Sequence, residues 1–138
     1  MGAPREPFPP PETLRRRHVL RWAAGELRRL FEVVFEDEPT LRILLREAVG
    51  LDASVEAMLG EIDDVLIGLV ADDLRASQET GYVRGDLDPR LTATLIVGGI
   101  EKLALAALRS AAPIDLDRLA AETSRLHVIG TISSRVPE

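Results

Sequence analysis

The sequence predicts an all-α protein, a bundle of about five helices in one domain. Apolar residues recur at intervals of three and four over long stretches, which is the helical period. No stretch alternates apolar and polar residues between hairpin turns, as strands would. Proline, glycine and aspartate stand between the apolar stretches, where helices end and begin. A length of 138 residues is enough for one core.

Composition restricts the class of protein. Apolar residues make up 46% and charged residues 29%, which is typical of a globular domain. The formal net charge of -6 argues against nucleic acid as the main partner. The absence of cysteine excludes disulfides and zinc–thiolate sites. We therefore expect a cytoplasmic protein.

The chain is expected to divide into a lead-in, residues 1–11, and a helical domain, residues 12–138. Prolines at positions 4, 7, 9, 10 and 11 predict that the lead-in is extended and mostly disordered. The first helix should run from near Glu12 or Thr13 to about Glu36. Trp22 and Val33 lie off its apolar stripe and indicate a second apolar surface. The stripe itself consists of Leu20, Ala23, Ala24, Leu27, Leu30, Phe31, Val34 and Phe35.

Two helices are predicted in the middle of the chain. Glu38-Pro39 ends the first helix, and a shorter one is expected from Thr40 to about Val49, closed by Gly50. Asp52 is the expected N-cap of a third helix, which runs from Ala53 to about Glu79. Its expected inner stripe is Val55, Met58, Leu59, Ile62, Leu66 and Leu69.

The fourth predicted helix organises the rest. Gly81 suits the left-handed residue after a helix, and Asp88-Pro89 is a strong start signal for the next. Glu101 and Lys102 near its middle argue against a membrane span. One side of this helix carries Ala93, Ile96, Val97, Ile100, Leu103, Ala104 and Ala107. The other side carries Leu91, Leu95, Gly98, Lys102 and Leu105.

Two apolar faces on one helix need two partners. A homodimer supplies the second partner, and two-fold dimers are common, so we favour a dimer over a central helix in a monomeric bundle. Which face meets the core stays open at this point. Asp115 is the expected N-cap of a fifth helix, which should fray at Ser133 and Ser134. One of its faces carries Leu116, Leu119, Thr123, Leu126 and Gly130.

Three segments carry a resemblance to a known family. They are Pro39 to Arg42 with Arg46 to Ala48, the turn Gly81 to Pro89 (Gly-x-x-Arg-x-Asp-x-Asp-Pro), and Leu91 to Glu101. With the order of long and short helices, they make the chain resemble the C-terminal, ligand-binding and dimerisation domain of TetR/AcrR-type transcriptional regulators. The likeness begins at about Leu14. The chain has no room for the helix-turn-helix DNA-binding domain of that family, so we expect either an excised domain or a natural remnant.

The resemblance implies a homodimer, a small apolar effector, and DNA binding only through the missing helix-turn-helix domain. It places the dimer interface in a four-helix bundle formed by the last two helices of each subunit. The interface residues expected on this basis are Ile96, Gly98, Gly99, Ile100, Leu103, Ala107, Leu119, Leu126 and Gly130.

An effector pocket is expected among the large residues of the first and third helices, with polar groups from the fourth. The candidates are Leu27, Phe31, Phe35, Met58, Ile62, Leu66, Thr94 and Glu101. The alternative is that these residues are filled core, because periodicity cannot distinguish a filled interior from a hollow one. A purely structural dimerisation module without a ligand is the corresponding second function.

No residue pattern predicts catalysis or a cofactor. His18 and His127 lack a second ligand at helical spacing, so no metal site is expected. Gly98-Gly99 lies inside a helix and cannot form a phosphate loop. The run Arg15 to Arg17 is more typical of a solvated face than of a nucleic-acid site, because no aromatic residues are interleaved with it. A helical enzyme is thus the least favoured reading.

Overall fold

The structure, a computed structural model, describes residues 9–36 and 53–138, without the side chains of Val34, residues 54–56, Met58 and Leu59. Its elements are a 3-10 turn η1 (Pro11–Thr13) and the helices α1 (Arg16–Phe35), α3 (Ala53–Glu79), α4 (Pro89–Arg109) and α5 (Leu116–Thr131). The described residues contain no strand, only an isolated bridge between Val83 and Ile132. The all-α prediction is confirmed for them. The helix predicted over residues 40–49 lies outside them.

The predicted helix boundaries follow from local signals. The Asp88 carboxylate accepts a hydrogen bond from the Leu91 N–H at 2.8 Å, and that of Asp115 accepts one from the Arg118 N–H at 3.1 Å. Both aspartates are therefore N-caps, as predicted. The first helix differs, because Leu14 is extended (φ -101°, ψ 157°) and separates η1 from α1.

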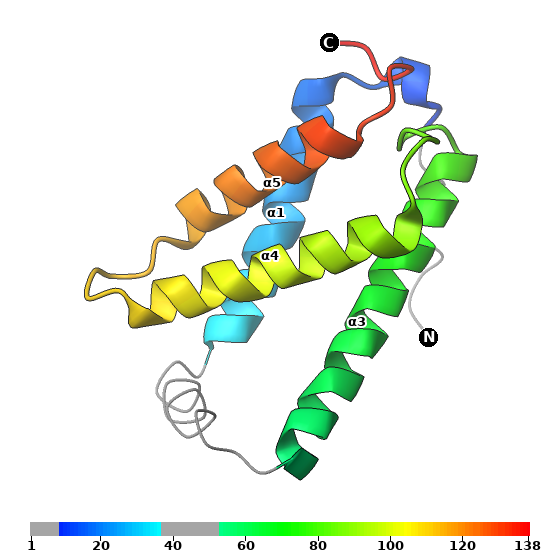
Figure 1. Ribbon diagram of the computed structural model, residues 1–138. Helices are drawn as coiled ribbons and strands as arrows, with labels where there is room; N and C mark the ends of the chain where they lie inside the picture. The colour runs from blue at the N-terminus through cyan, green and yellow to red at the C-terminus, as the bar shows by residue number, and fades with distance from the viewer. Residues whose placement is uncertain (1–8, 37–52) are drawn as a thin grey trace, which may run out of the picture.

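Figure 1 shows α4 and α5 as a hairpin, with α1 crossing behind it and α3 packed on α4. One core cluster joins α1, α4 and α5 through Phe31, Phe35, Leu108 and Ala120. The two phenyl rings stack with centroids 6.2 Å apart. A second cluster joins α3 and α4 through Ala71, Leu74 and Ala93. Helix α4 contributes to both clusters and so connects the two halves of the fold.

The stripe of α3 that faces the core is not the predicted one. Ile67, Val70, Ala71 and Leu74 pack on α4, whereas Ile62 and Leu66 are 49% and 43% exposed. The expectation that Ile62 and Leu66 face the interior is therefore wrong. Apolar residues cover most of the circumference of α3, so the helical period alone does not select a stripe. The close approach of small Ala71 and Ala93 selects it in the fold.

The C-terminal tail closes one end of the molecule instead of fraying, contrary to the sequence prediction. The Ser133 N–H donates to the Tyr82 carbonyl at 2.7 Å, and the Arg16 N–H donates to the Pro137 carbonyl at 2.9 Å. Val136 is fully buried. The tail therefore ties the start of α1 to the turn between α3 and α4.

Gly81 is required where the tail meets this turn. Its φ of +85° lies in the left-handed region, as predicted, and a Cβ built there would lie 2.1 Å from Arg135 Nη1. The Arg135 guanidinium is fixed in that place by Glu12, with 2.7 Å between Nε and Oε1.

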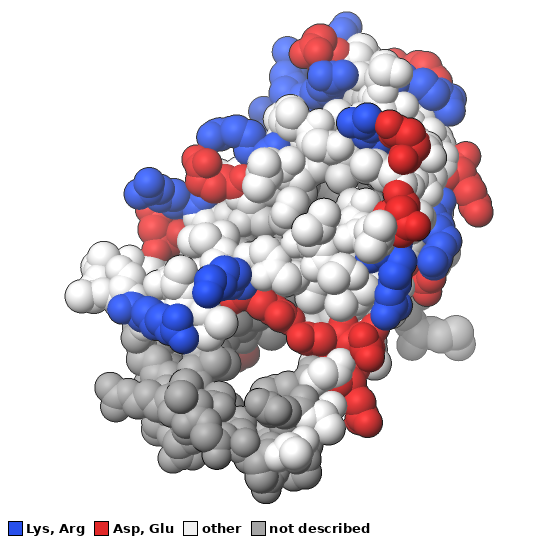
Figure 2. Space-filling view, in the orientation of Figure 1, with Lys and Arg blue, Asp and Glu red and all other residues white. Residues whose placement is uncertain are grey.

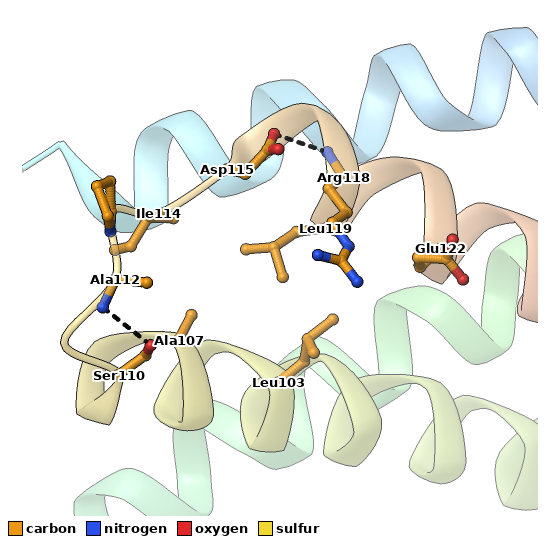
Figure 3. A pocket seen from close by; sticks show the side chains of 10 residues that line it. Leu103, Ala107, Ser110, Ala112, Ile114, Asp115, Arg118, Leu119 and Glu122 are labelled. Atoms are coloured by element: carbon orange, nitrogen blue, oxygen red, sulfur yellow. Dashed lines mark hydrogen bonds between the residues drawn. The ribbon is translucent and has the colours of Figure 1, made fainter.

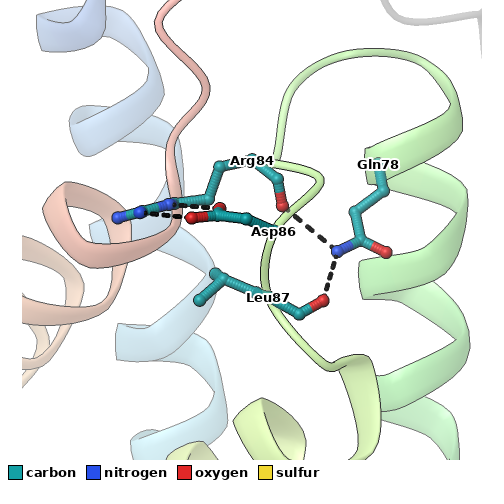
Figure 4. Close-up of polar contacts among 4 residues, drawn as sticks. All are labelled: Gln78, Arg84, Asp86 and Leu87. Carbon is teal, nitrogen blue, oxygen red and sulfur yellow. Dashed lines mark hydrogen bonds and ion pairs between the residues drawn. The ribbon is translucent and has the colours of Figure 1, made fainter.

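A side chain of α3 forms hydrogen bonds to the turn that carries the family resemblance (Figure 4). The Gln78 side-chain amide donates to the carbonyls of Arg84 and Leu87, at 3.1 and 2.8 Å. The Arg84 guanidinium meets the Asp86 carboxylate through two bonds of 2.7 Å. This ion pair is exposed and contributes little stability by itself. The amide bonds connect the end of α3 to the turn that leads into α4.

Candidate functional site

Helix α4 presents one face to the core and leaves the other open. Ala93, Val97 and Leu108 are buried, so the face containing Ala93 is the core face, which the sequence left undecided. On the opposite face Leu95 is 76% exposed and Leu91 is 67% exposed. These leucines have no covering element among the described parts of the chain.

Helix α5 continues this apolar surface. Leu126 is 73% exposed, and the helical period puts Gly130 on the same side. The seam between the helices is close here, since a Cβ built on Gly99 would lie 4.0 Å from His127 Nε2. We use the name open face for Leu91, Leu95, Gly98, Gly99, Leu126 and Gly130. Figure 2 shows uncharged residues across the middle of this side of the molecule, with charged residues around its edge and over the C-terminal half of α4. Lys102 is exposed one helical turn after Gly98.

The predicted interface residues separate into two groups. Gly98, Gly99, Leu126 and Gly130 are exposed and belong to the open face. The others contact the core of their own chain and are partly buried there: Ile96, Ile100, Leu103, Ala107 and Leu119. A helical wheel of α4 cannot make this separation, because both of its faces are apolar.

His127 lies in the seam between α5 and α4. It is half-buried, and this burial lowers the pKa of its imidazole. The ring is therefore neutral at neutral pH and fits against the small Gly99 without bringing a charge to the open face.

The predicted effector residues are not brought together. Leu27, Phe31 and Phe35 pack against Leu108 and Ala120 in the first cluster. Ile62 and Leu66 are exposed on α3, which packs on α4. The Thr94 hydroxyl is exposed and donates to the Arg90 carbonyl at 2.8 Å. The side chain of Met58 lies outside the described part. The α1 candidates thus line a filled core and the α3 candidates a surface.

Glu101, the remaining candidate, forms a carboxyl pair with Asp63 across α3 and α4. A hydrogen bond between the two side chains raises the Glu101 pKa to about 7, and burial and the Asp63 charge add to the effect. Two carboxyl groups can share a hydrogen bond only when one is protonated. Glu101 therefore holds a proton close to neutral pH.

A surface hollow of about 350 Å³ lies where α4 turns into α5 (Figure 3). Its floor is Leu103 and Ala107 of α4, and Leu119 and Arg118 of α5 stand on the opposite side. The turn completes the wall with Ser110, Ala112, Pro113, Ile114 and Asp115, and Glu122 closes the end on α5. Sequence reasoning missed this site because only the packing angle of the hairpin creates it. The signal available was the Pro113 break between two apolar helices.

Helix α4, with 21 residues and an 18-residue stretch of mean hydropathy 1.7, is long and apolar enough to cross a membrane by length and composition alone. The core helix of a soluble protein, which is mostly buried, passes the same test, and 17% of the apolar stretch of α4 is buried in the structure. Here its core face packs against α1 and α3. Among the described residues, no group of three His, Cys, Asp or Glu side chains is placed to hold a metal ion.

No family model, curated protein or solved structure matches this chain. The resemblance to TetR/AcrR-type regulators therefore stays a prediction carried by the turn at Gly81 to Pro89 and the helices around it.

Proposed function

We propose that this chain is a homodimerisation and effector-sensing domain of a TetR-type transcriptional regulator. In this proposal DNA is bound by a helix-turn-helix domain that the present chain does not contain. The observation that carries the proposal is the open face on α4 and α5, the last two helices. The resembled family would build its dimer from the same two helices.

The composition of the open face suits a second copy of the chain. Leu95 and Leu126 offer apolar side chains that are about three-quarters exposed, at 76% and 73%. Gly98 has nothing within 4 Å of a built Cβ, so a partner helix could approach the backbone of α4 closely there. An apolar centre surrounded by a charged edge is usual for protein–protein interfaces.

The sensing half of the proposal rests on the position of α4. This helix belongs to both core clusters and to the open face, so a change in its angle would alter the dimer. An effector that binds one arrangement of α4 and α5 more tightly than another would shift the population toward that arrangement. A DNA-binding domain joined to the chain before α1 would change its position with this shift.

The second candidate function is a purely structural dimerisation module. The filled cluster around Phe31 and Phe35 favours it, because the pocket predicted there is occupied by side chains of the chain itself. This alternative shares the dimer and lacks the effector.

Sedimentation velocity over micromolar concentrations tests the dimer. We expect wild type to sediment as a dimer and Gly98→Trp as a monomer with unchanged helix content, because the new ring has open space in the monomer. Gly60→Trp is the matched control: Gly60 is exposed on α3, also with nothing within 4 Å, and outside the open face. Wild type that stays monomeric, or a Gly98→Trp dimer, refutes the proposal.

A thermal-shift screen separates the sensor from the structural module. A ligand specific to the native state raises the melting temperature. A dimer whose melting temperature rises with a small molecule at saturating concentration supports sensing. A dimer that no small organic acid, amine or neutral apolar compound stabilises favours the structural module.

A further inference from the structure

We infer that the hollow at the α4–α5 turn binds a small amphipathic carboxylate, with Arg118 as the anion-binding residue. Naming this ligand class rests on the effector-binding half of the proposed function and is independent of the dimer. The inference combines an uncommitted guanidinium with an apolar concavity that is not part of the filled core.

The charges around the hollow leave Arg118 available. Glu122 is paired with Arg125, with 3.0 Å between Oε1 and Nη1. The Asp115 carboxylate accepts the capping bond from the Arg118 backbone N–H. Among the ion pairs of the described residues, none includes Arg118. Figure 3 shows its guanidinium reaching into the space between α5 and the Leu103 side of α4. Arg118 is thus a lining residue with a positive charge and no acidic partner among the described residues.

The remaining lining selects the rest of the ligand. Leu103, Ala107, Ile114 and Leu119 form apolar walls, which suit a short hydrocarbon or aromatic body. The Ser110 hydroxyl oxygen accepts from the Ala112 N–H at 3.2 Å, so its own proton is free to donate to an anion. A guanidinium binds a carboxylate through two parallel bonds, which a neutral amide or an amine cannot reproduce.

The volume limits the size of the ligand. About 350 Å³ lies at the lower end of small-molecule pockets. A monocarboxylic acid with a short apolar chain fits this size and places its two ends on the two kinds of wall. Such a ligand would contact α4, the turn and α5 together, and so stabilise one angle between the helices of the open face.

The test uses hexanoate, with hexanamide and hexylamine as probes of the same length and different charge. Binding to the full chain is followed by methyl NMR shifts of Ile114 and Leu119 and by the dissociation constant from titration. We expect saturable binding of hexanoate and at least about tenfold weaker binding of the other two probes, from the lost charge-assisted bonds.

Arg118→Gln should weaken hexanoate binding at least about tenfold. The matched control is Arg109→Gln, an exposed arginine at the end of α4 that does not line the hollow, and it should bind like wild type. Equal binding of hexanoate and hexanamide, unchanged binding by Arg118→Gln, or no shifts at millimolar hexanoate would overturn the inference. Sedimentation of the same samples separates the two proposals: a monomer that binds hexanoate refutes only the dimer, and a dimer that does not bind it refutes only this site.

Discussion

Replacing Leu95 by alanine should weaken the proposed dimer by a predictable amount. The change removes about three methylene-sized groups, and each buried group of this size contributes about 0.8 kcal/mol. Because the residue is 76% exposed in the single chain, most of this burial is left for a partner. Full coverage then corresponds to about 1.8 kcal/mol per protomer.

Two-fold symmetry doubles this effect, since each dimer contains both copies of the substitution. The expected loss is about 3.5 kcal/mol per dimer, which is about a 300-fold rise in the dissociation constant. The folded monomer should be unaffected or slightly more stable, because alanine has the higher helix propensity.

Sedimentation equilibrium over nanomolar to millimolar concentrations measures the dissociation constant directly. Leu69→Ala is the matched control, a leucine 60% exposed on α3 and outside the open face, and it should dimerise like wild type. A Leu95→Ala constant within threefold of wild type, or an equal weakening by both variants, refutes the reasoning that the open face is the interface.

Three further changes test other parts of the structure. The Glu101 pKa is raised to about 7, so its stabilisation is complete below the ordinary value near 4.5 and is lost as the pH rises through about 7. The melting temperature of wild type should therefore fall between pH 5 and 8, and Glu101→Gln should not show this fall. The same fall in the variant would contradict the carboxyl pair. Val136→Ala should lower the free energy of unfolding by about 2 kcal/mol in urea denaturation, because Val136 is fully buried, whereas a frayed tail would give no change. Gly81→Ala should cost at least about 1–2 kcal/mol through its positive φ, with a further loss from Arg135, and an equally stable variant would show that the turn relaxes.

Titration of His127 changes the stability in the opposite direction to titration of Glu101. Its lowered pKa means that the unfolded chain takes up a proton first, so stability is lost as the pH falls below about 6.5. Both proteins contain His127, so subtracting the melting temperature of Glu101→Gln from that of wild type at each pH removes the His127 contribution. That difference is the quantity to compare with the carboxyl pair.

Helix boundaries and caps could be predicted because their causes are local. The third helix was expected to end at Glu79 and does so, and Asp88 and Asp115 are N-caps as expected. Gly81 in the left-handed region follows from the same short-range sterics. The predicted start of α1 was wrong, because Leu14 is extended. The anchoring of the C-terminal tail was missed as well, because it depends on contacts between residues from 133 onward and distant parts of the chain.

The candidate site could be predicted only in part. The open face of α4 was anticipated as one of two apolar faces, with Leu91, Leu95 and Gly98 on it. Gly99, Leu126 and Gly130 were expected in a dimer interface, which stays a prediction. The pocket prediction joined α1 to α3, whereas the fold packs α1 on α5 and α3 on α4. The carboxyl pair of Glu101 and Asp63 was missed because the partner lies on another helix.

By itself the sequence determined that the described residues are helical, where α3 ends, which aspartates cap α4 and α5, and that α4 is apolar on two sides, because these properties depend on neighbours a few residues apart. Only the tertiary structure decided which side is buried, how the tail from Ser133 to Glu138 is held, and where a hollow remains. Those outcomes depend on which helix surfaces meet and at what angle, and small residues such as Ala71 and Ala93 decide this through close packing between segments far apart in the chain.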